Sequence, residues 1–463
     1  NRLAAFVKNA SRFRRALSQT LSQLRLITSR NVWKSNTNAF AIPLFVGFWQ
    51  WFLFGIALLV LLCLSLGWEY HNFLAFKNSG YRADISIVYA TVLNQYEKTS
   101  DRGTYHVLKL RMDNGKIFYT TTRDQIKNLM HKELRLNLIN SKVGFWDYLR
   151  GFYAFSVYTE LLPTKYGIKE RMRAYIAKQH ESPLLSGFYQ TLFLADTLPF
   201  AWRNNINALA ITHLLAISGF HYGVLSLFVL LLVYLPYSAL QRRFFPYRNA
   251  FFDIGLFTLA CGGFYLLLLQ NSPSFLRAFA MALFASFLAF CGIRVLSLLS
   301  LMLIALLLLA LFPSLFFSLG FLFSVAGVFY ILLFGQYYGF VGLKNLLLLQ
   351  YGTFAFMLPL VHAFLTPFSP YSILSIPLTL AFVAFYPLSI VLHLFGIGGL
   401  FDSLFLAFLD VSLPVAHLQT PPALFGAWAL LSLLAIAHKR LFVLLNVFCT
   451  LAFLWNLILF WLK

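Results

Sequence analysis

Long apolar segments recur along this chain and constrain its fold more than any other feature. A helix needs roughly 20 apolar residues to cross the hydrocarbon core of a bilayer, which is about 30 Å thick. Apolar segments, most of them near this length, lie around residues 40–67, 209–235, 250–270, 274–293, 296–312, 315–335, 345–365, 372–395, 404–417, 422–437 and 441–462. The sequence therefore predicts a polytopic α-helical membrane protein with about eleven spans, although residues 404–417 could equally form a re-entrant or interfacial segment.

The composition supports this class. Hydrophobic residues make up 60% of the chain and charged residues 11%, whereas an ordinary soluble domain has roughly 25% charged residues. A soluble protein is thereby excluded. The cysteines all lie in predicted spans, and their spacing fits neither a zinc site nor a disulfide framework. We expect them to pack as apolar side chains, and we expect no metal or cofactor.

Loop charges predict the orientation in the membrane. Residues 1–38 form a basic segment without any Asp or Glu, so the positive-inside rule places the N-terminus in the cytoplasm. Residues 39–68 are then the first transmembrane anchor. With alternating spans, most of the later basic loop residues also fall on the cytoplasmic side: Arg242, Arg243, Arg248, Arg294, Lys344, Lys439 and Arg440. The polar residues after the anchor are therefore expected to be extracytoplasmic.

Residues 69–146 predict a small β domain. Residues 85–94 and 104–112 are rich in β-branched and aromatic side chains, and Asp113-Asn114-Gly115 is a hairpin turn signal. Ile126, Leu129 and Met130 have helical spacing, and residues 134–139 alternate again. Three strands, a short helix and further strand follow the order of an OB-fold, a small barrel that often binds single-stranded nucleic acid. Other small barrels remain possible.

One face of this domain is a candidate binding surface for single-stranded DNA. Strand alternation places Tyr105, Lys109 and Arg111 on one face of the second strand. Basic and aromatic residues of the next strand extend the set: Lys116, Phe118, Tyr119 and Arg123. Such a mixture suits stacking of unpaired bases and attraction of phosphates. An ordinary solvated strand face is the alternative.

Residues 147–182 predict an amphipathic interfacial helix region. Phe152, Phe155, Tyr158 and Leu162 are spaced by three or four residues, and several lysines and arginines follow. A basic amphipathic helix of this kind lies in the membrane interface. A connecting helix packed on the barrel is equally compatible with the pattern.

The remaining residues, 183–463, form a multi-span domain that opens with the stretch THLLAISGFHYG at residues 212–223. Ionisable side chains in a span usually face the bundle interior or a cavity, and the Ser218-Gly219 pair can kink or break a helix. Eight residues of ideal helix separate His213 and His221 by about 12 Å, too far for one metal ion. Histidines that hydrogen-bond between helices are the alternative.

This stretch resembles the signature of the ComEC competence-protein family, the inner-membrane channel proteins that pass transforming DNA into bacteria. Residues 272–281, SPSFLRAFAM, which include Arg277, and residues 318–328, SLGFLFSVAGV, are similar to further family elements in the same order. The family commonly has glycine at the position of Ala210 and glutamine at the position of Leu322. It also places an OB-like domain between the first anchor and the channel.

The resemblance implies a channel for single-stranded DNA in the bacterial inner membrane, used in natural competence, with no catalytic residues. The channel path would include His213, Ser218, Gly219, His221 and Arg277. The printed sequence shows neither the His-x-His-x-Asp-His cluster of a C-terminal metallo-β-lactamase-like domain nor a Walker-type phosphate loop. The expected partners, besides the DNA and the lipid bilayer, are therefore a separate nuclease, a DNA receptor and a cytoplasmic motor or helicase.

Two other functions remain open. Ser218 could be the nucleophile of an intramembrane serine hydrolase, with His362 or His393 as its base. The chain could also be a membrane assembly protein without a conducting path.

Overall fold

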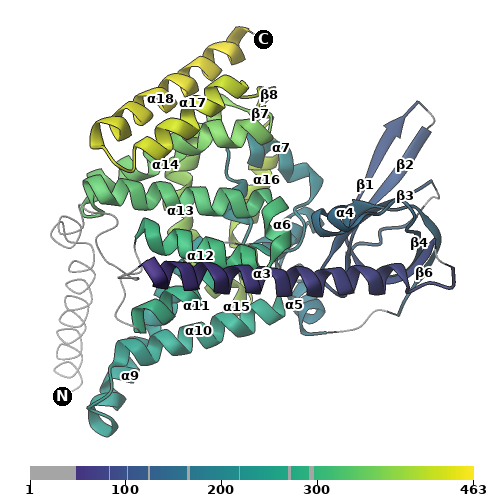
Figure 1. Ribbon diagram of the computed structural model, residues 1–463, viewed down its shortest axis with the longest axis horizontal. Helices are drawn as coiled ribbons and strands as arrows, with labels where there is room; N and C mark the ends of the chain where they lie inside the picture. Colours follow the sequence, from purple (N-terminus) through teal and green to yellow (C-terminus); the bar gives the residue numbers. More distant parts are fainter. Residues whose placement is uncertain are drawn as a thin grey trace.

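The computed structural model describes residues 48–82, 84–101, 103–123, 126–163, 167–217, 219–269, 273–290 and 297–462. Within these residues the chain is mostly helical, with one six-stranded and one two-stranded sheet. Figure 1 shows the six-stranded sheet at one end of the molecule, beside a body of helices. The predicted basic segment 1–38 and Ser218 lie outside the described residues.

Helix α3 (Phe48–Lys77) joins the helical body to the sheet (Figure 1). Its 30 residues span about 45 Å, more than the thickness of a hydrocarbon core. The end of the helix packs into the sheet domain, where Phe73 and Phe76 are buried in the core and Lys77 donates a hydrogen bond to the carbonyl of Asn140. The helix therefore continues past the predicted end of the anchor and becomes part of the sheet domain.

The first four strands of the sheet are β1 (Ile85–Ser100), β2 (Gly103–Met112), β3 (Ile117–Thr122) and β4 (Glu133–Ile139), and they lie in the spatial order β3-β2-β1-β4. Strand β1 is antiparallel to both β2 and β4, and β2 is antiparallel to β3. Gly115 closes the β2–β3 turn with φ of +82°, a conformation that favours glycine. The strands and the turn predicted from the sequence are confirmed.

Residues 152–161 hydrogen-bond to β3 and β4, the outer two of these four strands. After helix α4 (Phe145–Arg150), β5 (Phe152–Tyr153) runs parallel to β3, and β6 (Ser156–Leu161) runs antiparallel to β4. The resulting strand order, β5-β3-β2-β1-β4-β6, curls into a half-barrel. The helix predicted from Phe152 to Leu162 is wrong, because pairing with two strand edges overrides local periodicity here.

The core of the sheet domain corrects two predicted DNA-binding residues. Phe118 is fully buried and stacks on Phe152, with ring centroids 5.6 Å apart. Lys116 forms an ion pair with Glu69 at 2.8 Å, beside the ring of Tyr148. Both residues lie on the side of β3 that meets α3. Neither belongs to the face that carries Lys109, because alternation along β3 sends its side chains to opposite sides.

In the part of the chain that the structure describes, the helical body has fourteen α-helices. They are α5 (Ile168–Ala177), α6 (Pro183–Leu194), α7 (Phe200–Ala208), α8 (Thr212–Leu215), α9 (Gly219–Phe244), α10 (Ala250–Leu268), α11 (Pro273–Phe290), α12 (Leu298–Leu311), α13 (Leu319–Tyr338), α14 (Leu343–Phe364), α15 (Ser375–Leu394), α16 (Asp402–Leu409), α17 (Pro422–Leu434) and α18 (Lys439–Leu462). Three 3₁₀ turns, η1 (Pro313–Phe317), η2 (Pro370–Leu374) and η3 (Gly398–Phe401), and the pair β7 (Pro367–Phe368) and β8 (Ala416–His417) connect them.

Several of these helices are compatible with membrane spans. Among the described residues, five helices, one of which is α3, are long and apolar enough to cross a bilayer. The bent helix α9 would be a sixth if it counts as one span. The bend lies at Pro236, which cannot donate the helical hydrogen bond. Five shorter apolar helices accompany them. The helical membrane class is confirmed, and the number of eleven spans stays a prediction.

Two predicted segments have different boundaries in the structure. The segment 209–235 is not one helix, because α9 begins only at Gly219. Of the segment 404–417, only the part up to Leu409 is helical, within an α16 of 8 residues. Eight helical residues extend about 12 Å, so this helix is too short to cross a bilayer.

Replacement of Phe118 by Ala tests the assignment of its side chain to the core. We expect the sheet domain to lose about 3–5 kcal/mol of stability, the usual cost of removing a buried phenyl ring. Thermal denaturation and limited proteolysis of the detergent-solubilised protein measure this loss. Tyr119→Ala is the matched control, because Tyr119 is only half-buried and should cost much less. Equal losses in the two variants would contradict the assignment.

Candidate nucleic-acid interface

Basic side chains gather where the sheet domain meets the helical body. We call this group the basic seam. Its members are Lys109 and Arg111 on β2, His131 before β4, Lys169 and Arg173 on α5, and Arg203 on α7. The two domains share this surface because the outer face of β2 turns toward α5 and α7. The seam therefore includes part of the strand face that the sequence predicts to bind DNA.

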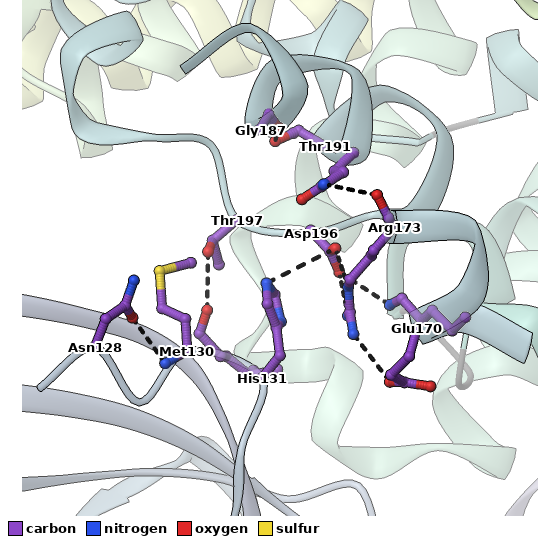
Figure 2. A network of polar contacts seen from close by, with 12 residues as sticks. Asn128, Met130, His131, Glu170, Arg173, Gly187, Thr191, Asp196 and Thr197 are labelled. Carbon is purple, nitrogen blue, oxygen red and sulfur yellow. Dashed lines mark hydrogen bonds and ion pairs between the residues drawn. The ribbon is translucent and has the colours of Figure 1, made fainter. Parts of the chain in front are cut away.

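Asp196 lies at the centre of the seam, just after α6 (Figure 2). Its carboxylate accepts two hydrogen bonds from Arg173, Nε to Oδ2 at 2.6 Å and Nη2 to Oδ1 at 2.8 Å. Lys169 Nζ is 3.1 Å from Oδ1, and His131 Nε2 is 3.8 Å from Oδ2. The carboxylate thus joins α5, the end of α6 and the sheet domain.

The electrostatics of Asp196 follow from burial and from its partners. Burial alone would raise the pKa of Asp196, but the hydrogen bonds from Arg173 and the charge of Lys169 together hold it below its ordinary value. Burial lowers the pKa of His131, with Asp196 opposing, so this imidazole is neutral at pH 7. Asp196 is therefore a permanent anion at neutral pH that holds two cations.

The loop that presents His131 was predicted as a helix. Its described residues 126–132 are not helical, and His131 has φ of +64°. Side chains replace the helical hydrogen bonds: Asn128 Oδ1 accepts from the Met130 amide, and Gln95 Oε1 accepts from the Leu129 amide. Such local hydrogen bonds compete with helix formation. The prediction is wrong at this loop for that reason.

A second contact ties the end of α6 to β1. The pairing of β1 with β2 shifts register between Val92 and Asn94. The carbonyl of Leu93, at this bulge, accepts a hydrogen bond from the Thr197 hydroxyl at 2.8 Å. A bulge frees backbone groups of its strand from the ladder. The sheet domain is therefore attached to this segment twice, through Asp196 and through the next residue, Thr197.

The seam carries more positive than negative charge. Glu170, which pairs with Arg173 at 3.0 Å, and Asp196 are its carboxylates. The seam contains five side chains of Lys or Arg, of which Arg111, Lys169 and Arg173 interact with Asp196. Burial, and then the charge of Arg203, lower the pKa of Lys109, as expected for cations held close together. Lys109 also lies over the ring of Tyr119, with its Nζ 5.9 Å from the centroid.

Asp196→Asn should loosen the junction between the two domains. Loss of one partner from a buried ion pair typically costs about 3–5 kcal/mol, because the remaining charges stay buried without compensation. Thermal denaturation and proteolysis at the junction measure this effect. Because the pKa of Asp196 is lowered on folding, its stabilisation is present above the ordinary pKa and lost as the pH falls through the lowered one. Asp410→Asn, at an exposed carboxylate, is the control, and an equal effect there would contradict the role of Asp196.

The stretch at residues 212–223 is a broken helix. Helix α8 ends at Leu215, Ala216 is extended, and α9 starts at Gly219. Ala210, which precedes α8, has φ of +53°. This left-handed conformation favours glycine, so the alanine here is strained relative to a glycine at the same position.

The histidines of this stretch have different surroundings. His213 is exposed on α8, with its Nδ1 3.0 Å from the carbonyl of Ala210. His221 is buried in the first turn of α9, and its ring meets Phe382 and Tyr386 of α15 edge-on. Neither histidine lies within a long straight span.

Gly219 connects the broken helix to α11. A Cβ at Gly219 would lie 3.7 Å from the Cβ of Ala278, the residue after Arg277. Arg277 itself is buried, with only 6% of its surface exposed. A Cβ at Gly320 of α13 would lie 2.9 Å from Arg277 Nη2, so this glycine makes room for the guanidinium.

Arg277 has no compensating charge in the part of the chain that the structure describes. Its Nε is buried without a hydrogen-bond partner there. No described Asp or Glu forms an ion pair with it. An unpaired buried cation is costly, and such a group in a membrane domain usually marks an ion or substrate path.

The structure brings together only part of the predicted site. Lys109, Arg111 and Tyr119 belong to the surface near the seam, Tyr105 is half-buried further along β2, and Arg123 is exposed after β3. The sequence analysis missed the contributions of His131, Lys169, Arg173, Asp196 and Arg203. One available signal was the scarcity of acids, since Asp196 is one of four acidic residues after residue 182.

The two histidines named as bases in the serine hydrolase hypothesis have different surroundings. His362 Nδ1 lies 3.2 Å from the carbonyl of Leu365. His393 uses both ring nitrogens, Nδ1 with the Ser389 carbonyl and Nε2 with His180. Ser218 lies outside the described residues.

The apolar helices and the attached half-barrel define a helical membrane protein with a polar sheet domain. A family model described as Competence protein matches residues 192–463. The chain therefore belongs to the competence protein family. The match includes Asp196, residues 212–223 and Arg277, and it leaves out the sheet domain. No curated protein and no solved structure matches the chain.

Membership in this family supports a role in DNA uptake during competence and association with a membrane. It also favours transport over catalysis.

Proposed function

We propose that this protein is the inner-membrane channel that passes single-stranded DNA into the cytoplasm during natural competence. The observation that carries the proposal is the basic seam, which contains five lysine and arginine side chains and two carboxylates between the sheet and the helices. An excess of positive charge beside aromatic rings attracts a phosphate backbone and stacks unpaired bases. The seam would receive the strand.

The sheet topology supports an OB-like domain. A five-stranded OB barrel closes through its last strand, and here the segment 152–161 contacts both β3 and β4. The helix of this domain, α4, follows β4. In this proposal the sheet domain lies outside the cytoplasm, the N-terminus lies inside, and separate motor, receptor and nuclease proteins act with the channel.

The described contacts suggest a route from the seam into the helical body. Asp196 lies two residues after the end of α6, and the chain then passes through α7 and the broken helix α8–α9. Gly219 of that break packs beside α11, which carries Arg277. A DNA phosphate would supply the counter-charge that Arg277 lacks. A path with few cations binds phosphate without trapping it, as conduction requires.

Lys109→Gln and Arg203→Gln test the role of the seam. Each variant should weaken binding of single-stranded DNA and reduce the slope of log affinity against log salt by roughly 0.7, the value for one lost phosphate contact. Fluorescence anisotropy of a labelled oligonucleotide with the full-length protein at several salt concentrations measures both. Lys142→Gln, an exposed lysine after β4, is the matched control. An unchanged slope in both seam variants would argue against the proposal.

Arg277→Gln tests the path. The variant removes an unpaired buried charge and breaks no described ion pair, so it should still fold and insert. We expect labelled DNA to reach the outer compartment and entry into the cytoplasm to fall at least tenfold. Arg243→Gln, at the exposed end of α9, is the matched control and should transport normally. Normal entry with Arg277→Gln would refute a role of this residue in transport.

A further inference from the structure

Three titratable side chains form a cluster on the far side of α5 from the seam. His180 lies between α5 and α6, His393 in the last turn of α15, and Asp402 at the start of α16. His180 Nδ1 is 2.9 Å from Asp402 Oδ1, and His180 Nε2 is 3.1 Å from His393 Nε2. His393 Nδ1 is 2.7 Å from the carbonyl of Ser389. Nothing in the proposed channel function uses these groups.

The number of hydrogen bonds fixes the number of protons in this cluster. The Ser389 carbonyl can only accept, so His393 Nδ1 carries a proton. One proton lies between His180 and Asp402, and another lies between the two Nε2 atoms. Two neutral imidazoles and one carboxylate anion hold only two protons, whereas these three hydrogen bonds need three. The observed geometry therefore requires one additional proton, which makes the cluster electrically neutral.

Burial gives the additional proton a physical reason. The side chain of His180 is 0% exposed and that of Asp402 15% exposed. Among the described residues, no lysine or arginine forms an ion pair with Asp402. Without the proton, the carboxylate would be a buried anion with no cation, which is costly.

The other titratable groups that face the cluster are tyrosines. Tyr189 of α6 stacks on His180, with centroids 4.6 Å apart, and its ring also lies 4.6 Å from that of His393. Tyr175 of α5 donates a hydrogen bond to the carbonyl of His393 at 2.9 Å. Phenols are neutral at pH 7, so the histidines and Asp402 are the groups that exchange the proton.

A metal ion does not fit the same atoms. Asp402 contacts Nδ1 of His180, on the opposite side of the ring from Nε2. Only two nitrogens thus face each other, whereas structural zinc takes four ligands and catalytic zinc at least three from the protein. No group of three metal-ligating side chains occurs in the described residues.

The surrounding backbone holds the cluster closed. Gln179 Nε2 donates to the His393 carbonyl at 3.1 Å, and its Oε1 accepts from the Gly398 amide at 2.9 Å. A Cβ at Gly398 would lie 2.7 Å from His393 Nε2. Only glycine at this position allows η3 to approach the ring of His393 so closely. The backbone of η3 therefore covers the contact between His180 and His393.

We propose that His180, His393 and Asp402 form a proton-binding site that latches the α5–α6 junction to α15 and α16. The hydrogen bond between the two Nε2 atoms exists only while the additional proton is bound. When that proton leaves, two acceptors face each other and the latch opens. His180 follows the end of α5, and α5 carries Lys169 and Arg173. The latch therefore also fixes the helix that supplies two cations to the seam.

The sign of the pH effect follows from the proton count. The hydrogen bond stabilises the protonated cluster only. Its stabilisation is therefore present at low pH and lost as the pH rises through the midpoint of the transition.

Nuclear magnetic resonance of ¹⁵N-histidine in the full-length protein, held in lipid nanodiscs, tests the proposal. At low pH we expect a nitrogen–nitrogen coupling across the hydrogen bond between two histidine rings, and we expect it to disappear as the pH rises. His393→Gln should abolish the coupling. His362→Gln, which changes a buried histidine elsewhere in the bundle, should leave it intact.

Asp402→Asn provides a second, independent measurement. The carboxamide can donate a hydrogen bond to His180 Nδ1. His180 Nε2 then keeps its proton toward His393 without the additional proton, and the coupling should persist as the pH rises. An absent coupling at every pH in the wild-type protein would overturn the proposal, and so would a spectrum that responds to added zinc and not to pH. Neither measurement involves DNA, so its failure is distinct from failure of the channel function.

Discussion

The buried carboxylate of Asp196 holds the sheet domain and the helices in one arrangement. A buried anion is stable only with partners, and here these come from separate elements: Arg173 and Lys169 from α5, and His131 from the sheet. Because each partner must reach the same two oxygens, the three elements have little freedom relative to one another. A surface ion pair between the domains would not impose this, since exposed pairs contribute little.

The same ion pairs also determine which positive charges of the seam remain available to a ligand. Asp196 and Glu170 neutralise charge on α5, where they contact Arg173 and Lys169. Neither acid is hydrogen-bonded to Lys109 on the sheet side of the seam, where burial and Arg203 lower the lysine's pKa. Positive charge therefore accumulates on the strand face, next to the ring of Tyr119. The seam as a whole thus carries more positive than negative charge at the junction of the two domains.

The sequence predicts the parts of this molecule that depend on local chemistry. The β2–β3 turn needs Gly115 at positive φ, and the alternation along β2 buries Leu108 and Leu110 as expected. Predictions fail where distant partners decide. Residues 152–161 have helical spacing but pair with two strand edges, and Phe118 is buried because α3 continues into the sheet. No local pattern shows that His131 and Asp196, 65 positions apart, meet.

The broken helix around residue 218 shows how a local signal can be correct while its position is wrong. Polar residues and glycine predict an interruption, and the structure has one, but His213 lies on a separate exposed turn and only His221 enters α9. A continuous helix would hold both histidines at a fixed distance from each other along one helix axis. The break instead releases them to different surroundings and brings Gly219 against α11. A Cβ at Gly219 would be in ordinary van der Waals contact with Ala278 of α11, so the break lies beside the helix that carries the unpaired charge of Arg277.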